Sequence, residues 1–280
     1  MNTCLLGLLA ETSIHPGAGQ SSGIVDLPVA REAATDYPVV PGSSLKGALL
    51  GLARQRELNG KEHMTTQDRD RIFGRSDNAG ALLVSDARLL LLPVRSLSSA
   101  YKWITCPHLM ERFSRDRQRA GIGNQIEASQ PATGKYLGYP SADASTLFLE
   151  ERQFEHGGGL PGSIVPALGP LISYPKTRER LAEQLVLLHN DDFAWFARYG
   201  LAIQARNVLD PEKKTSANLW YEETIPADAL FYAVFAERQA GALDAATKLF
   251  DQHPYLQVGG NETIGMGWFA VALPAQKGAA

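Results

Sequence analysis

Residues 41–53 read PGSSLKGALLGLA and begin the clearest helix in the N-terminal part of the sequence. Apolar residues recur there at the i, i+3, i+4, i+7 and i+8 spacing of a helix with one buried face, namely Leu45, Ala48, Leu49, Leu52 and Ala53. Ser43 or Ser44 can supply the N-cap oxygen. An apolar strand candidate precedes this helix at 4–10, and another follows at 80–94 with a polar interruption, which gives the order β–α–β.

The C-terminal part has the same order. Strands are predicted at 219–224 and 229–237, a helix at 243–252, and strands at 255–258 and 268–273. Two β–α–β units separated by insertions match the split βαβ plan of ferredoxin-like domains. We therefore predict an α+β fold with a modified ferredoxin-like, RRM-like core, built as a single domain over 1–280.

Two segments interrupt this plan. Glycine and proline break up residues 15–41, and a loop this long inside a globular domain is usually functional or mobile. Residues 121–177 have little helical periodicity and contain a strand candidate at 146–151, so we interpret them as an insertion with a β-hairpin. Helices are predicted on either side of the insertion, at 107–119 and 178–189.

Composition excludes several classes of protein. A 280-residue chain with 44% hydrophobic residues can bury a substantial core, and it has no apolar run long enough to span a membrane and no secretory signal. We expect a cytoplasmic protein without a membrane partner. Two cysteines, Cys4 and Cys106, exclude a disulfide framework and a four-thiolate zinc site and are expected to be buried hydrophobes. The net charge of −3 gives no bulk signature of nucleic-acid binding.

Two glycine-containing segments could approach a ligand. The turn and helix start at 41–47 offer unpaired backbone amides to an anion, and Lys46 adds a charge, although the spacing is not that of a P-loop. Residues 259–268, GGNETIGMGW, place four glycines between two strands, where a ligand could come close to the backbone. An ordinary Ser-capped helix and a glycine-rich hairpin remain the alternatives.

Charged and titratable residues give weaker signals. Asp26 could hold a divalent cation or accept a proton, and His15 could act as a general acid or base, although loop residues of both types are more often structural. The adjacent Glu222 and Glu223 should point to opposite faces of a strand. Of two basic groups, the better candidate for phosphate contact is the one with fewer acidic neighbours: Lys102, Arg112, Arg115, Arg117 and Arg119.

Taken together, these segments resemble the RAMP proteins of CRISPR systems, and in particular the repeating backbone subunit of the type III-B (Cmr) effector complex. The resemblance is carried by HPGAG at 15–19, VDLPVARE at 25–32, YPVVPGSSLKGAL at 37–49 and the glycine segment at 259–268. Shorter stretches agree with it: Phe73-Gly74, Ser85-Asp86-Ala87 and LWYEE at 219–223.

The resemblance implies a subunit whose copies stack into a helical filament along a CRISPR guide RNA, together with other Cmr-type subunits. A β-hairpin "thumb" would reach the next copy, and we place it within 140–175, the region without another assignment. The loop aspartate matching Asp26 would be needed for cleavage of target single-stranded RNA with a divalent metal ion, Mg or Mn. His15 would be an auxiliary catalytic residue.

The resemblance also implies a surface for the guide backbone at the helix start and the glycine segment. The residues assigned to it are Ser43, Ser44, Lys46, Arg54, Gly260, Gly265 and Gly267. The chain departs from the family pattern at Leu50, where many relatives carry arginine, and Arg54 is the candidate substitute one turn later.

The predicted function is thus a guide-binding backbone subunit that is also a metal-dependent endoribonuclease. Two alternatives remain open at this point. One is a structural guide-binding subunit without catalysis. The other is a stand-alone endoribonuclease that processes CRISPR RNA with His15 as its general base.

Overall fold

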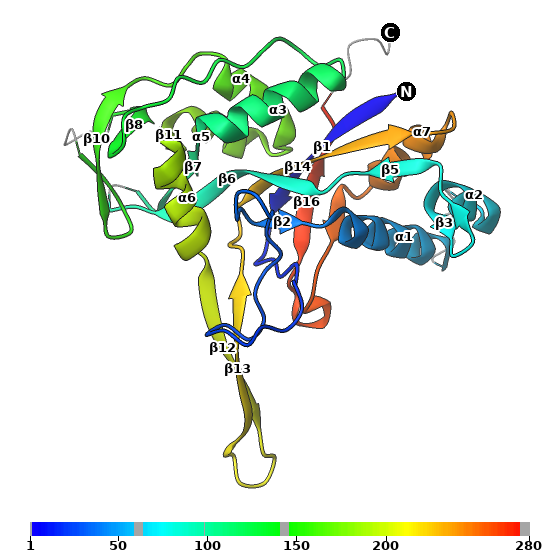
Figure 1. Cartoon of the computed structure of the whole chain (residues 1–280). Coiled ribbons are helices and arrows are strands. Elements are labelled where there is room, and N and C mark those ends of the chain that lie inside the picture. Colours follow the sequence, from blue (N-terminus) through cyan, green and yellow to red (C-terminus); the bar gives the residue numbers. More distant parts are fainter. Residues whose placement is uncertain (1, 59–63, 98, 141–145, 275–280) are drawn as a thin grey trace.

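A computed structural model describes residues 2–58, 64–97, 99–140 and 146–274. Its centre is an antiparallel sheet in the order β16 (Trp268–Ala272), β1 (Thr3–Ala10), β14 (Leu230–Glu237) and β6 (Ala87–Arg95) (Figure 1). Helix α1 (Gly42–Leu58) connects β1 to β6, and α7 (Ala242–Thr247) connects β14 to β16. This is the split βαβ arrangement, which confirms the predicted core.

The amphipathic pattern of α1 correctly predicts which face of the helix is buried. Leu45, Leu49 and Ala53 are buried in the core, whereas Ser43, Ser44 and Gly47 are exposed. The strand predicted at 80–94 is split into β5 (Leu82–Val84) and β6, and the polar pair Ser85-Asp86 forms the break. Asp86 accepts a hydrogen bond from the Gly42 amide (2.7 Å), so this break also fixes the start of α1.

The sheet continues past β6 through β7 (Tyr101–Thr105), β11 (Leu185–Leu188), β8 (Lys135–Gly138), β10 (Arg152–Gly158) and β9 (Thr146–Leu149). The predicted insertion therefore contains the β9–β10 hairpin, and its residues 141–145 lie outside the described residues. Several short elements complete the fold: β2 (Val39–Val40), α2 (Thr66–Phe73), β3 (Gly74–Arg75), β4 (Asn78–Ala79), α4 (Ile164–Leu168), α6 (Asn190–Tyr199), β15 (Tyr255–Gln257) and the 3₁₀ turns 169–171, 248–250 and 262–264.

Helix α3 (Pro107–Arg119) forms as predicted, with Leu109, Met110 and Phe113 buried. The helix predicted at 178–189 is only partly correct. Helix α5 (Pro175–Gln184) ends before the run Leu185–Leu188, which is strand β11 between β7 and β8. All four residues of that run are buried, because a strand covered on both faces reads as a continuous apolar segment rather than an alternating one.

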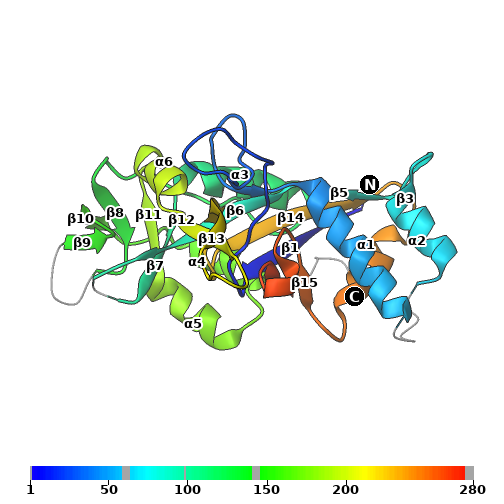
Figure 2. The same cartoon turned by 90° about the horizontal axis from the view of Figure 1, so that it is seen from below.

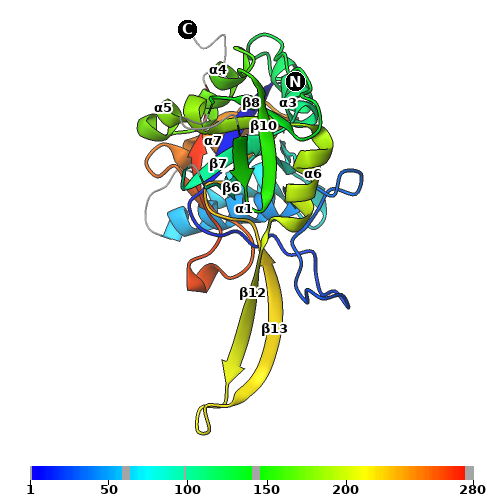
Figure 3. The same ribbon diagram turned by 90° about the vertical axis from the view of Figure 1, so that its left-hand side faces the viewer.

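The position predicted for the thumb is wrong. The β9–β10 hairpin is part of the main sheet, whereas β12 (Ala202–Leu209) and β13 (Ser216–Thr224) form a separate two-stranded sheet that projects far from the body (Figures 1 and 3). Every residue of β12 is exposed or half-buried. Alternating apolar and polar residues mark a strand that buries one face. Neither face of β12 is buried, so its sequence lacks this pattern.

The cysteine prediction is confirmed, because Cys4 and Cys106 are both free and buried, and burial raises the pKa of each thiol to about 11. Among the described residues, no helix is both long enough and apolar enough to span a membrane.

Candidate functional site

The long loop that contains His15 and Asp26 packs at the base of the projecting hairpin (Figure 1). Isolated β-bridges fix it there: Ile14 pairs with Ile225, and Leu27 pairs in parallel with Glu222. Within the loop, Gly17 pairs with Val29. Viewed from below, the loop forms an arch beside α1 and the hairpin (Figure 2). The loop is therefore a folded segment held against β13.

Asp26 lies half-buried where the loop meets the hairpin. Its Oδ2 accepts a hydrogen bond from the Tyr221 amide (2.7 Å), and its carbonyl accepts one from the Ser21 amide (2.9 Å). Within the described part of the chain, no hydrogen bond or ion pair involves Oδ1 of Asp26. The backbone thus orients the carboxylate while one of its oxygens stays available to a ligand.

A divalent cation at Asp26 would need ligands from outside this chain. No group of three or more His, Cys, Asp or Glu side chains suited to a metal occurs among the residues in the described ranges. Mg²⁺ commonly retains several waters and binds to one or two carboxylates plus substrate phosphates. The residues present fit such a cation only if RNA oxygens complete its coordination.

His15 is buried between the loop and the glycine segment. Its Nδ1 lies 2.8 Å from the Glu223 carbonyl oxygen and 3.6 Å from Oε1 of Glu222. Because a carbonyl oxygen only accepts, Nδ1 carries the hydrogen and Nε2 keeps its lone pair when the ring is neutral. A Cβ added at Gly17 or Gly260 would lie 3.1 or 3.2 Å from the ring. The imidazole therefore packs between its own loop, strand β13 and the glycine segment.

Glu222 and Glu223 point to opposite faces of β13, as predicted, and each fixes a different segment. Glu222 accepts from Asn261 of the glycine segment and lies 3.4 Å from Nε of Arg206 on β12. Glu223 accepts from the Val29 amide (3.1 Å). Its other oxygen accepts from Arg31 (2.7 Å).

The adjacent acidic pair is therefore a clamp that joins the hairpin, the loop and the glycine segment. Sequence reasoning noted the pair but missed this role. No local signal in the sequence indicates it, because the apolar residues Leu219 and Tyr221 of the same strand are exposed.

The backbone conformation of the glycine segment is set mainly by contacts within this chain. Gly267 has φ +90°, and a Cβ there would lie 2.5 Å from the Val258 carbonyl oxygen. Gly265 also has a positive φ (+85°) but faces open space. The Gly260 amide donates to the His15 carbonyl (2.8 Å). Backbone geometry thus accounts for Gly265 and Gly267, whereas Gly260 lines a cavity.

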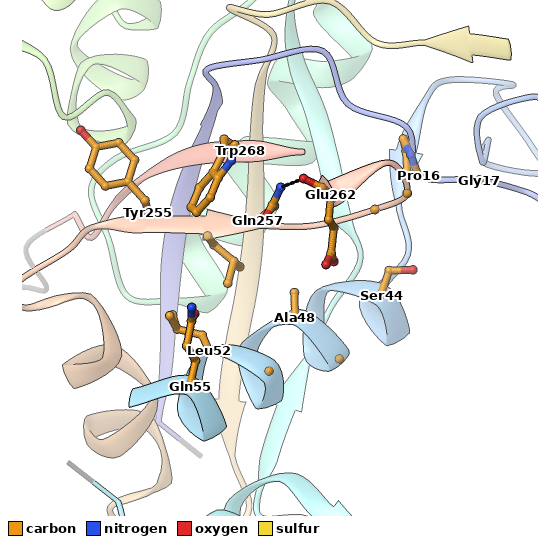
Figure 4. Close-up of a pocket in the computed structure, with 15 residues that line it drawn as sticks. Pro16, Gly17, Ser44, Ala48, Leu52, Gln55, Tyr255, Gln257, Glu262 and Trp268 are labelled. Carbon is orange, nitrogen blue, oxygen red and sulfur yellow. Dashed lines mark hydrogen bonds between the residues drawn. The ribbon is translucent and has the colours of Figure 1, made fainter. Parts of the chain in front are cut away.

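That cavity is a groove of about 570 Å³ between α1 and the edge strand β15 (Figure 4). Ser44 and Gln55 lie along its α1 wall, with Gly47 and Gly51 between them. A Cβ added at Gly47 or Gly51 would meet nothing within 4 Å, although glycine inside a helix costs roughly 1 kcal/mol relative to alanine. Packing within this chain therefore does not explain these two glycines.

The residues predicted to bind the guide do not form one surface. Ser44 and Gly260 line the groove, whereas Ser43 and Lys46 line a second cavity, of about 520 Å³, on another face of α1. Arg54 is exposed and lines neither cavity. The Gly42 amide at the helix start is already bonded to Asp86, so an external anion would have to bind beside it.

The basic group around α3 is divided among separate partners. Lys102 donates to the Glu183 carbonyl, Arg112 pairs with Glu32, Arg115 pairs with Glu111, Arg119 pairs with Asp116, and Arg117 lies over the Phe113 ring. The five side chains therefore do not share one partner, and their contact with phosphate stays a prediction. Only Arg119 lines the cavity that contains Lys46.

A split βαβ core, a long loop after the first strand, a glycine segment before the last strand and a projecting hairpin define the class of this protein. The RAMP superfamily model matches residues 8–270, and the chain belongs to that superfamily.

Several of its relatives are Cmr4 proteins. The chain is 32% identical to the "CRISPR system Cmr endoribonuclease Cmr4" of Pyrococcus furiosus, over 98% of this chain and 96% of that protein. It is 25% identical to the "CRISPR system CMR subunit Cmr4" of Saccharolobus solfataricus, over 92% of each. The crystal structure of oligomeric Cmr4 from Pyrococcus furiosus superposes with a TM-score of 0.77 at 28% identity, over 98% of both chains. The resemblance and the fold class predicted from sequence are confirmed.

Proposed function

We propose that this chain is a backbone subunit of a Cmr-type CRISPR complex, where it binds guide RNA and cleaves complementary target RNA. The relative named as an endoribonuclease supports the activity, because the similarity extends over nearly all of both chains. The observation that carries the proposal is Asp26, oriented by the Tyr221 amide at the base of the hairpin with its second oxygen available. A carboxylate that is fixed through one oxygen and has its other oxygen available is typical of a reacting group rather than of a residue that only stabilises a turn.

RNA can be cleaved by its own 2′-OH when that group is deprotonated and aligned with the scissile phosphate. The 2′-oxygen then bonds to phosphorus as a 2′,3′-cyclic phosphate, the bond from phosphorus to the 5′-oxygen breaks, and the released 5′-oxygen takes a proton from water. The hairpin and the ordered loop would hold a target nucleotide in that alignment. Asp26 would take the proton or bind a cation, and Mg²⁺ or Mn²⁺ completed by RNA oxygens would neutralise the developing charge. His15 would support the loop through its bond to the Glu223 carbonyl.

The same relatives support an assembly. The Cmr4 of Pyrococcus furiosus is oligomeric, and we propose that copies of this chain stack along the guide with other Cmr subunits. The β12–β13 hairpin, not the β9–β10 hairpin, would reach the next copy. A net charge of −3 suits a subunit that shares its RNA with its neighbours.

The test is Asp26→Asn in the reconstituted complex. Asparagine can still accept from the Tyr221 amide but carries no charge. We expect target cleavage to fall by at least about 100-fold while guide RNA stays bound, and we expect EDTA to abolish the wild-type activity. The matched control is Asp36→Asn in the same loop, which should cleave normally. Unchanged cleavage by Asp26→Asn would refute the catalytic assignment and favour the purely structural subunit.

Guide processing by His15 is the weaker candidate function, because its side chain is only 9% exposed and its Nδ1 is held by the backbone. It predicts metal-independent cleavage of a repeat hairpin by the isolated protein and loss of that activity in His15→Ala. If the isolated protein leaves such a hairpin intact, this alternative fails.

A further inference from the structure

Helix α6 carries two aromatic side chains outside the face that it buries. The buried face is made of Phe193, Phe196 and Ala197. Trp195 and Tyr199 lie one turn apart on another face, where Trp195 is half-buried and Tyr199 is 63% exposed. Core packing within the described part of this chain therefore does not explain why an aromatic ring stands at Tyr199.

Two arginines complete this surface, and we call Trp195, Tyr199, Arg152 and Arg198 the α6 patch. The guanidinium carbon of Arg152, at the start of β10, lies 5.0 Å from the centre of the Trp195 ring. The centre of the Tyr199 ring lies 5.8 Å from that of Trp195 and 5.9 Å from the guanidinium carbon of Arg198. Four planar groups thus lie next to one another.

Both arginines of the α6 patch are held in place by carboxylates. The buried Asp192 accepts from Arg152 (3.1 Å) through Oδ1 and from the Gly134 amide (2.9 Å) through Oδ2. Arg198 donates to Asp36 (2.8 Å). The two arginine side chains nevertheless remain 33% and 51% exposed. A surface that is ordered in this way loses little side-chain entropy when it binds a ligand.

The charge of the α6 patch is balanced, which restricts the kind of ligand that it fits. Arg152 is paired with Asp192 and Arg198 with Asp36, so the patch has no excess of positive charge. A phosphate gains little from such a surface, because the paired charges largely cancel at a distance. A flat, uncharged π system gains more, because it can stack on the exposed ring and lie against the guanidinium groups. Nucleobases are ligands of this kind.

The α6 patch adjoins the candidate cleavage site. Arg31 of the long loop donates to the Ala197 carbonyl (2.8 Å) and to Glu223 (2.7 Å), so one side chain joins α6 to the loop and to β13. Helix α6 ends at Tyr199, and the chain enters the projecting hairpin at Ala202 (Figures 1 and 3). An RNA strand that passes the base of the hairpin therefore comes close to Tyr199.

We infer that the α6 patch binds an unpaired base of single-stranded RNA, with the Tyr199 ring as the stacking surface and with Trp195 and Arg152 supporting that ring. The choice of RNA as the ligand rests on the proposed function. Stacking tolerates any sequence because every base has a π face, so the patch accepts all four bases.

The experiment compares Tyr199→Ala with Tyr139→Ala in the full-length protein. Tyr139 is the matched control, because it is 62% exposed and follows β8, outside the patch. Fluorescence anisotropy measures the binding of a labelled oligouridylate and of an abasic oligomer of the same length. Loss of a stacked base should weaken oligouridylate binding at least about fivefold. The slope of log K against log salt should stay unchanged, because no phosphate contact is lost.

Two comparisons isolate the base and the ring. The abasic oligomer should bind equally to the wild type and to both alanine variants, and Tyr139→Ala should bind oligouridylate as the wild type does. Tyr199→Phe keeps the ring without the hydroxyl group and should retain the wild-type affinity.

The inference is overturned if Tyr199→Ala binds oligouridylate as tightly as Tyr139→Ala does, or if the wild type does not bind this oligomer. Equal losses for oligouridylate and the abasic oligomer would indicate a backbone contact and also overturn it. Altered sedimentation of Tyr199→Ala with unchanged RNA binding would instead assign the patch to contact between copies. Failure of Asp26→Asn to affect cleavage would leave the result untouched, since the readout is binding alone.

Discussion

Removing the carboxylate of Glu223 should release the loop that carries Asp26. Glu223 is 8% exposed and accepts from the Val29 amide and from Arg31. Val29 itself is 1% exposed, so water does not reach its amide when the carboxylate is absent. The variant Glu223→Ala therefore leaves a buried donor unsatisfied and a largely buried guanidinium without its counter-ion.

The magnitude follows from those two losses. An unsatisfied buried amide costs about 1–3 kcal/mol, and breaking a buried ion pair costs about 3–5 kcal/mol. Arg31 keeps its bonds to the Asp36 and Ala197 carbonyls, which offsets part of the ion-pair cost and lowers the total below the roughly 4 kcal/mol given by the two lower limits. A loss of about 3 kcal/mol or more corresponds to at least a roughly 100-fold increase in loop opening.

Hydrogen exchange at the Val29 amide measures this opening directly. Glu223→Ala should exchange at least about 100-fold faster, and Glu223→Gln, which keeps an acceptor but no charge, should be intermediate. The exposed Glu179→Ala should match the wild type. If the Val29 amide of Glu223→Ala exchanges at a rate within about threefold of the wild-type rate, Glu223 does not hold the loop in place.

Two further predictions concern stability. Gly47→Ala and Gly51→Ala should each raise the free energy of unfolding by roughly 0.5–1 kcal/mol in urea denaturation, because the added Cβ has open space, and a destabilised variant would contradict the assigned geometry. The buried thiols of Cys4 and Cys106, with pKa values raised from 9.0 to about 11, should stay protonated in the folded protein while the unfolded chain ionises. The contribution of these thiols to the free energy of unfolding should therefore be fully present below pH 9 and be lost between pH 9 and 11. If the free energy of unfolding of a Cys4→Ala, Cys106→Ala double variant falls just as steeply over this range, the thiols are not the cause.

The core was predictable because its segments are apolar in recognisable ways. Helix α1 formed close to the predicted bounds because it buries one periodic apolar face, and β1, β14 and β16 did so because they are nearly continuous apolar runs buried on both faces. The run Leu185–Leu188 was misassigned because four buried apolar residues satisfy a helix and a two-sided strand equally. Strand β12 was missed because neither of its faces is buried.

The site was only partly predictable for a different reason. His15, Asp26 and Gly260 were identified as candidates, and the fold brings all three to the base of the hairpin or to the adjoining groove. The groups that hold His15 and Asp26 are the Glu223 carbonyl and the Tyr221 amide, about two hundred residues further along the chain. No local pattern reveals such pairings. Ser43 and Ser44 are adjacent in sequence yet face different cavities, which only the helix geometry shows.

The most direct test of the central claim is the single-turnover rate at which the assembled complex cuts a labelled complementary RNA. The wild-type subunit is compared with Asp26→Asn in preparations that hold equal amounts of guide RNA. The account predicts defined products from the wild type and a rate at least about 100-fold lower from Asp26→Asn. Equal rates would show that the Asp26 carboxylate does not take part in cleavage.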